Sequence, residues 1–182
     1  KAFTGQYTTD SNHRGMGGGD AISIVSCENV SIKNLNINGN NENKILGGKW
    51  ANWTYETGNF GISIYDSRDI FLENLDIREC ALDGVYLSNK TELGFATESQ
   101  NINLNNITCI QNGRQGMSWV GGVGVTAIGC KFNLTARGKN FYSSPGAGLN
   151  IEPNTPNVAS IGKFIDCEFI DNFSTGFATS GD

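Results

Sequence analysis

The chain has 182 residues, 38% of them hydrophobic, and this length can bury one core. Its 13 basic and 18 acidic residues give a net charge of −5, and no Lys/Arg cluster could follow a phosphate backbone, so nucleic acid is not an expected partner. No apolar run reaches the roughly 18 residues that a membrane span needs, and 24 Gly against 3 Pro favour tightly turning strands over a disordered chain.

Residues 1–20 are Gly-rich and polar, and we expect them to be an entry segment ahead of a single domain over residues 21–182. They contain the only histidine of the chain, His13. A lone histidine beside Arg14 is a poor candidate for a metal ligand or a catalytic base.

A four-residue phrase of Gly, apolar, polar and apolar residues recurs along the chain. Alternation with period two indicates a short strand with one buried face, and its repetition indicates a stack of such strands. The copies are Gly61-Ile62-Ser63-Ile64, Gly84-Val85-Tyr86-Leu87, Gly116-Met117-Ser118-Trp119 and Gly148-Leu149-Asn150-Ile151, with an Ala-led copy at Ala21-Ile22-Ser23-Ile24 and a weaker one at Gly176-Phe177-Ala178-Thr179.

A second phrase, small or polar, apolar, polar, apolar, lies between these copies. From its last residue to the next Gly the step is seven residues at 77 to 84, 109 to 116 and 169 to 176, whereas the Gly phrases are 23 (61 to 84), 32 (84 to 116) or 28 (148 to 176) residues apart. One constant turn, with variable loops leaving another corner, predicts a parallel β-helix of about five to six coils. The copies are Asn34-Leu35-Asn36-Ile37, Asn74-Leu75-Asp76-Ile77, Asn106-Ile107-Thr108-Cys109, Gly129-Cys130-Lys131-Phe132 and Asp166-Cys167-Glu168-Phe169.

Three excursions are expected to leave the coils, at residues 41–60, 88–100 and 135–145. The first carries Trp50 and Trp53 among polar residues. Flat aromatic rings stack on the C–H faces of sugars while their polar edges stay wet, so a sugar-binding rim is one interpretation. A flap over the apolar side of the stack is the other.

Five cysteines are present, none close enough in sequence to another for a CxxC site. Cys130 and Cys167 fall in one inward column with Leu35, Leu75 and Ile107. Stacked reduced thiols that act as small hydrophobes are favoured, and a disulfide between adjacent coils is the alternative because the spacing allows it.

Asparagines recur at two positions of the repeat. Amides buried in register can bond to the coils above and below, which satisfies turn backbone and predicts a structural role. One series is Asn34, Asn74 and Asn106, and the other, three residues after the second phrase, is Asn40, Asn112 and Asn172.

The polar residues of the Gly-led strands are expected to point outward and to form a track for a glycan. Glu152 follows the inward Ile151 and precedes Pro153, which makes it the first catalytic candidate, with a solvated strand-ending glutamate as the alternative. The expected substrate contacts are Tyr65, Tyr86, Ser118, Asn150, Arg114, Trp50, Trp53 and Tyr142.

Asp83 and Arg114 occupy neighbouring turns, where an ion pair that braces the corner is favoured over an acid with its charge-stabilising partner. Hydrolysis of a glycosidic bond needs two carboxyls, about 5–5.5 Å apart for retention and about 6.5–9.5 Å apart for inversion. Strand geometry places Asp83 roughly 18 Å from Glu152, and Asp182 roughly 8 Å from it. Asp182 is therefore the expected second carboxylate, with further chain or a neighbouring subunit as alternative sources of that acid. Asp83 is a weaker catalytic candidate.

Together these phrases, with Asp83-Gly84-Val85-Tyr86-Leu87, Asn112-Gly113-Arg114-Gln115-Gly116 and Ala147-Gly148-Leu149-Asn150-Ile151-Glu152-Pro153-Asn154, make a combined pattern. It resembles the right-handed β-helix proteins of the pectate-lyase-like superfamily, above all bacteriophage tailspikes and bacterial polysaccharide-degrading proteins, over residues 20–182. The resemblance implies an elongated surface with a shallow carbohydrate groove, often in a homotrimer, on a virion surface or secreted by bacteria.

We therefore expect a right-handed parallel β-helix from an extracellular depolymerase that cleaves bacterial capsule, O-antigen or exopolysaccharide. A polysaccharide lyase is one alternative, with Arg114, Arg137, Lys139 and Tyr142 as its candidate groups. An adhesin that binds without cutting is the other. No cofactor or metal is predicted, because Asp66, Asp69 and Asp83 fall in different columns. Neither end looks capped, so further chain or a partner is expected to cover the ends.

Overall fold

The computed structural model describes residues 19–41, 59–89, 98–138, 143, 145–153 and 161–179. In these residues the regular elements are β-strands, and none forms a helix long and apolar enough to span a membrane. The strands are β1 (Ile22–Val25), β2 (Glu28–Asn38), β3 (Ile62–Tyr65), β4 (Arg68–Arg78), β5 (Asp83–Ser88), β6 (Gln100–Ile110), β7 (Gln115–Trp119), β8 (Val123–Ile128), β9 (Lys131–Asn133), β10 (Ala147–Ile151), β11 (Gly162–Ile165) and β12 (Phe177–Thr179).

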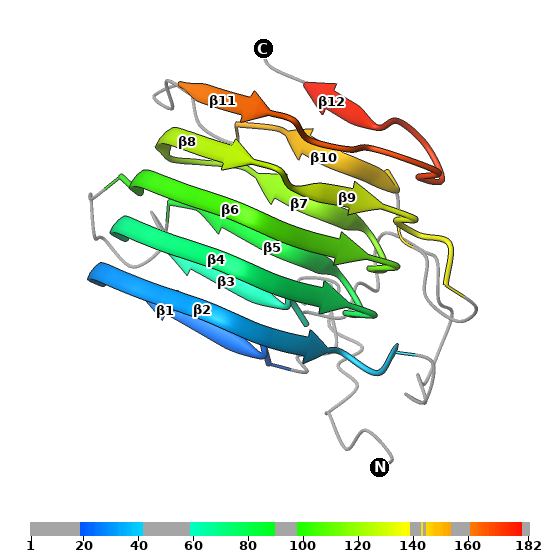
Figure 1. Cartoon of the computed structure of the whole chain (residues 1–182), viewed down its shortest axis with the longest axis horizontal. Coiled ribbons are helices and arrows are strands. Elements are labelled where there is room, and N and C mark those ends of the chain that lie inside the picture. Colours follow the sequence, from blue (N-terminus) through cyan, green and yellow to red (C-terminus); the bar gives the residue numbers. More distant parts are fainter. Residues whose placement is uncertain are drawn as a thin grey trace, which may run out of the picture.

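The strands stack into two parallel sheets that face each other across the core (Figure 1). The first sheet has the order β1-β3-β5-β7-β10-β12, and the second has the order β11-β8-β6-β4-β2, with β9 also paired to β6. Apart from β8 and β9, which both lie in the second sheet, consecutive strands alternate between the sheets, so the described strands build five coils and the first strand of a sixth. This confirms the predicted parallel β-helix.

The Gly-led phrase forms the first sheet, in the predicted register. Ile62 pairs with Val85, Val85 with Met117 and Met117 with Leu149, all facing the core. The glycine before each of them lies where the coils meet closely: a Cβ on Gly84 would stand 2.7 Å from the carbonyl oxygen of Gly116. Glycine recurs here because a side chain has no room.

Each long strand of the second sheet bends at an asparagine with left-handed backbone. Asn34, Asn74 and Asn106 have φ of 55°, 54° and 52°, a conformation that asparagine tolerates better than most residues. The bend shifts the alternation by one residue, so Leu72 before Asn74 and Leu75 after it are both buried.

The prediction that these three asparagines are buried is wrong, because all three are exposed. Their side chains form a surface ladder, in which the Asn106 amide donates to Asn74 Oδ1 at 2.8 Å and the Asn74 amide donates to Asn34 Oδ1 at 3.1 Å. Their role is structural, as predicted, but it comes from backbone conformation and bonds along the surface.

The second asparagine series matches the prediction at two of its three positions. Asn112 accepts from the Cys80 amide at 3.0 Å and donates to the Ile77 carbonyl at 3.3 Å. Asn172 is buried in the same way. Asn40 is exposed instead, and its neighbour Asn41 is 1% exposed and donates to the Cys80 carbonyl at 3.3 Å.

The cysteine column also follows the predicted register. Leu75 pairs with Ile107, and the pairing of Thr108 with Lys131 and of Lys131 with Glu168 extends the column to Cys130 and Cys167. All five cysteines are free thiols, so the favoured interpretation holds and the disulfide is not formed. Cys80, Cys109 and Cys130 are buried as small apolar side chains.

Insertions leave the β-helix at both corners, whereas one variable corner was predicted. The four-residue turns 79–82 and 111–114 connect the second sheet to the first, and so do the long connections from β2 to β3 and from β9 to β10. The long connection from β5 to β6 lies at the opposite corner. The step of seven residues therefore holds in particular coils, and this corner does not have one fixed length along the whole β-helix.

Candidate functional site

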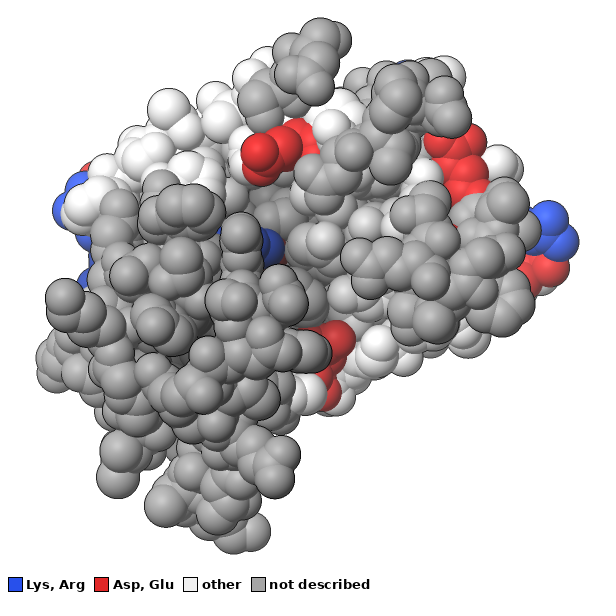
Figure 2. Space-filling view, turned by 180° about the vertical axis from the view of Figure 1, so that it is seen from behind, with Lys and Arg blue, Asp and Glu red and all other residues white. Residues whose placement is uncertain are grey.

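The residues predicted to form a glycan track lie on the outer face of the first sheet. Ser63, Tyr86, Ser118 and Asn150 are direct register partners on β3, β5, β7 and β10, and the residues on either side of each face the core. The outward alternation is thus confirmed. Figure 2 shows the molecule from this side, with its acidic side chains at separate places.

Burial divides this track into two kinds of residue. Ser63 is 0% exposed and Ser118 is 2% exposed, so neither hydroxyl lies on an open surface. Ser63 donates to Asp20 Oδ2 at 2.5 Å, and Asp20 Oδ1 accepts from the Phe60 amide at 3.1 Å. Among the expected substrate contacts in the described residues, Tyr65, Tyr86 and Arg114 keep partly exposed side chains, whereas Asn150 is 7% exposed.

Three aromatic rings meet at the N-terminal half of this face. The Phe60 and Tyr86 rings stack with centroids 4.4 Å apart and planes 11° apart, and the Tyr65 ring tilts against Tyr86 at 5.7 Å. Burial is the main cause that raises the pKa of Tyr65 well above its ordinary value, and the neighbouring Tyr86 and the carboxylates of Asp20 and Asp83 add to it. The Tyr65 hydroxyl therefore keeps its proton.

Phe60 and Asp20 were not predicted as site residues. Phe60 was placed in the excursion 41–60 and Asp20 in the entry segment. Both stand one residue before a copy of the strand phrase, in the column that continues through Asp83 and Gln115. This shared position in the repeat is the sequence feature from which both residues could have been predicted to lie on the same face.

Asp83 and Arg114 form the predicted ion pair. Arg114 Nε lies 2.9 Å from Asp83 Oδ1, and Nη2 lies 2.6 Å from Oδ2. The Asp83 side chain is fully buried and that of Arg114 is 18% exposed. Asp83 is in register with Gln115, and Gln115 with Ala147, so Glu152 lies two coils away and five residues further along, which keeps the roughly 18 Å estimate.

Glu152 lies at the C-terminal edge of β10 with an exposed side chain. The Asn150 side-chain amide donates to Glu152 Oε2 at 2.9 Å, and the Glu152 amide donates to the Trp119 carbonyl at 3.0 Å. These bonds orient a carboxylate toward the outer face. On the β7 side its neighbour is the apolar Val120, so in the described part of the chain no second carboxylate stands beside it there.

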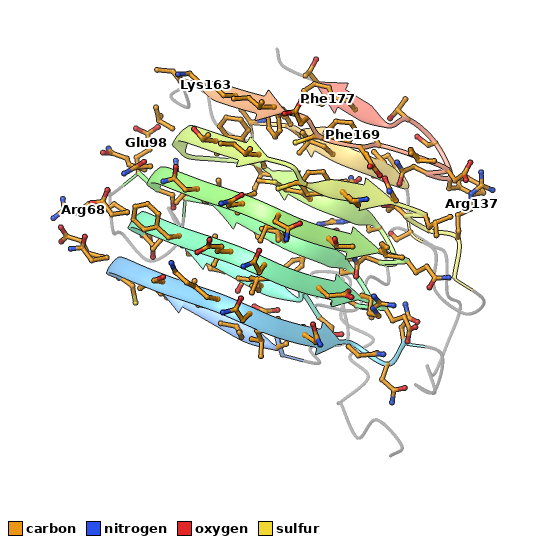
Figure 3. The ribbon with its side chains drawn as sticks, viewed as in Figure 1. Arg68, Glu98, Arg137, Lys163, Phe169 and Phe177 are labelled. Carbon is orange, nitrogen blue, oxygen red and sulfur yellow. The ribbon has the colours of Figure 1, made fainter. Side chains whose placement is uncertain are left out.

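Several predicted site residues lie outside the described residues. They are Asp182, Trp50, Trp53 and Tyr142, together with Lys139 of the lyase alternative. The remaining lyase candidate, Arg137, donates to the Asp171 carbonyl at 3.2 Å, and its guanidinium stands 5.5 Å from the Phe173 ring centroid. Figure 3 shows Arg137 at the edge of the molecule.

Metal ions bind to carboxylates, thiols and imidazoles, and the described residues offer such side chains. Among them, no group of three or more His, Cys, Asp and Glu residues converges in a way that could hold a metal ion.

Comparison with known proteins supplies a family but no relative. The family model described as "Right handed beta helix region" matches residues 4–156. No curated protein and no solved structure matches the chain. The match extends over most of the chain and names neither a reaction nor a substrate.

Proposed function

The chain belongs to the right-handed β-helix family, and we propose that it is an extracellular depolymerase that binds a bacterial polysaccharide and cleaves a glycosidic bond beside Glu152. A right-handed parallel β-helix fits proteins that bind or act on polysaccharides. The observation that carries the proposal is the alignment, on one face, of half-buried aromatic rings with an exposed carboxylate oriented by an amide.

In this reaction Glu152 acts as the general acid and protonates the leaving oxygen of the glycosidic bond. In the same step a second carboxylate takes a proton from a water that attacks the anomeric carbon as the glycosidic bond breaks, and a separation of about 6.5–9.5 Å gives inversion. Asp182 is the proposed partner. Asn150 is the positioning residue, because its side-chain amide donates to Glu152 Oε2 and leaves Oε1 for the substrate.

Binding without cleavage is the second candidate function. It is favoured by the commitment of Asp83 to Arg114 and by the apolar neighbour Val120 beside Glu152. The same ion pair weakens the lyase alternative, because Arg114 already neutralises a carboxylate of the protein itself.

The protein is proposed to assemble as a homotrimer on a virion surface, or as a secreted bacterial protein. Apolar side chains on the outer face of the second sheet support an assembly, with Phe71 45% exposed, Ile128 42% and Ile165 45%. Light scattering of the purified protein tests the number of subunits.

The activity test uses the native protein, Glu152→Gln and the matched control Glu73→Gln, whose carboxylate lies on the second sheet and pairs with Lys33. Each is incubated with a panel of bacterial polysaccharides. The proposal expects new reducing ends without ultraviolet absorbance of unsaturated products, lost in Glu152→Gln and kept in Glu73→Gln. Rising ultraviolet absorbance would support a lyase. Binding without cleavage, with the same affinity in Glu152→Gln, would contradict the enzyme and support an adhesin.

A further inference from the structure

Phe60, Tyr65 and Tyr86 form an aromatic cluster that the cleavage step does not use. All three side chains are partly exposed, although they lie beside fully buried neighbours such as Ser63 and Asp83. Their rings come from two adjacent coils and support one another, since Phe60 stacks on Tyr86 and Tyr65 tilts against it. Mutual packing fixes these rings in a preformed arrangement, which lowers the entropy lost on binding.

The cluster lies at a defined distance from Glu152. Tyr86 is in register with Ser118, and Ser118 with Asn150, the residue that orients Glu152. Two strand spacings separate Tyr86 from Asn150, which is about 10 Å along the coil axis. This is roughly the length of two linked pyranose rings.

The chemistry beside the cluster indicates the kind of sugar. The Asp20 carboxylate lies one coil from Phe60 and Tyr65 and two coils from Tyr86, and it accepts from Ser63 and from the Phe60 amide. A carboxylate accepts hydrogen bonds from sugar hydroxyls and repels another carboxylate. Aromatic faces bind the C–H face of a ring that carries no charge there.

We propose that the Phe60–Tyr65–Tyr86 cluster is a stacking subsite for a neutral sugar, two coils from Glu152, so that the protein requires a glycan long enough to span both. This inference rests on the proposed function of the same face. It predicts poor cleavage of fragments of one or two sugars, because a ring bound on the cluster places the scissile bond about two sugar rings away.

The experiment uses Phe60→Leu and Tyr86→Leu, which keep apolar bulk but remove the flat faces, with Phe71→Leu on the second sheet as the matched control. The probe is a size-fractionated ladder made by partial acid hydrolysis of each neutral polysaccharide in the panel. Binding is measured by calorimetry in the Glu152→Gln background, and KM and kcat with Glu152 intact. Urea unfolding checks that every variant folds.

The expected result is a loss of affinity of about tenfold for long oligosaccharides in Phe60→Leu and Tyr86→Leu, with KM raised, kcat kept and no change for the shortest fragments. Equal affinities in Phe60→Leu and Phe71→Leu at every length, in a protein that still cleaves, would overturn the subsite alone. If long oligosaccharides bind and Phe60→Leu weakens that binding, but the native protein cleaves none of them, the subsite proposal stands and the depolymerase proposal is wrong. Binding to none of the ladders would overturn both.

Discussion

The guanidinium of Arg114 holds both carboxylate oxygens of Asp83, one at 2.9 Å through Nε and one at 2.6 Å through Nη2. The pair joins the first residue of β5 to the turn before β7, so it fastens two coils at one corner. Such bidentate pairs combine geometric specificity with charge.

Replacing Asp83 by Asn is expected to destabilise the fold by about 3 kcal/mol, because it removes the carboxylate charge that faces the Arg114 guanidinium in a largely buried site. Urea unfolding followed by circular dichroism measures the change. Replacing both residues together, as Asp83→Leu with Arg114→Met, is expected to cost less than Asp83→Asn alone. The single variants Asp83→Leu and Arg114→Met are measured as well. A double variant whose loss of stability equals the sum of these two losses would contradict this coupling.

The glycine column predicts a sharp contrast between two Gly→Ala substitutions. A Cβ at position 84 would stand 2.7 Å from the Gly116 carbonyl oxygen and 2.8 Å from Cys109 Sγ, so Gly84→Ala forces backbone apart and is expected to cost about 3 kcal/mol. At Gly138 the nearest atom is 3.9 Å away, so Gly138→Ala is expected to be nearly neutral. Similar midpoints in thermal unfolding for the two variants would refute the close-contact explanation.

The buried amide of Asn112 predicts a larger effect than that of an exposed asparagine. Asn112→Ala leaves the Cys80 amide and the Ile77 carbonyl without their bonds inside the coil and is expected to cost about 2 kcal/mol. Asn105→Ala, at an exposed strand position, is expected to change stability by less than about 0.5 kcal/mol. Denaturant midpoints compare the two, and a cost at position 105 equal to that at 112 would count against the buried bonds.

The strand register could be predicted from the sequence because the buried interior imposes it locally. Val85 and Met117 each follow a glycine that has no room for a side chain, and alternation then fixes which neighbours face the core. The Asp83–Arg114 pair was also predictable, since both residues sit just before a copy of the same phrase.

Burial on the outer face could not be predicted in the same way. Ser118 and Tyr86 occupy equivalent outward positions, yet Ser118 is 2% exposed and Tyr86 is partly exposed, a difference that the period-two alternation does not encode. The asparagine bends show a related limit. An asparagine that recurs at the position of Asn74 is compatible with a buried side-chain amide and also with a left-handed backbone. The periodic pattern alone does not show which of the two applies.

The stacked thiols predict a loss of stability at alkaline pH. Burial is the main cause that raises the pKa of Cys130 from its ordinary value of 9.0 to about 11, and burial also raises the pKa of Cys109 well above that ordinary value. In the unfolded chain both thiols lose their protons near pH 9, whereas the folded protein keeps them protonated. The contribution of Cys130 is therefore complete below pH 9 and lost as the pH rises toward about 11, and the contribution of Cys109 changes in the same direction.

The free energy of unfolding measured from pH 8 to pH 11 is expected to fall with a slope that Cys130→Ala reduces. The matched control is Cys27→Ala, which removes an exposed thiol and is expected to leave the slope unchanged. Equal slopes in the native protein and in Cys130→Ala would show that other groups, such as Tyr65, cause the alkaline loss. Because Cys130→Ala also leaves a cavity, the comparison concerns the pH dependence and not the stability at neutral pH.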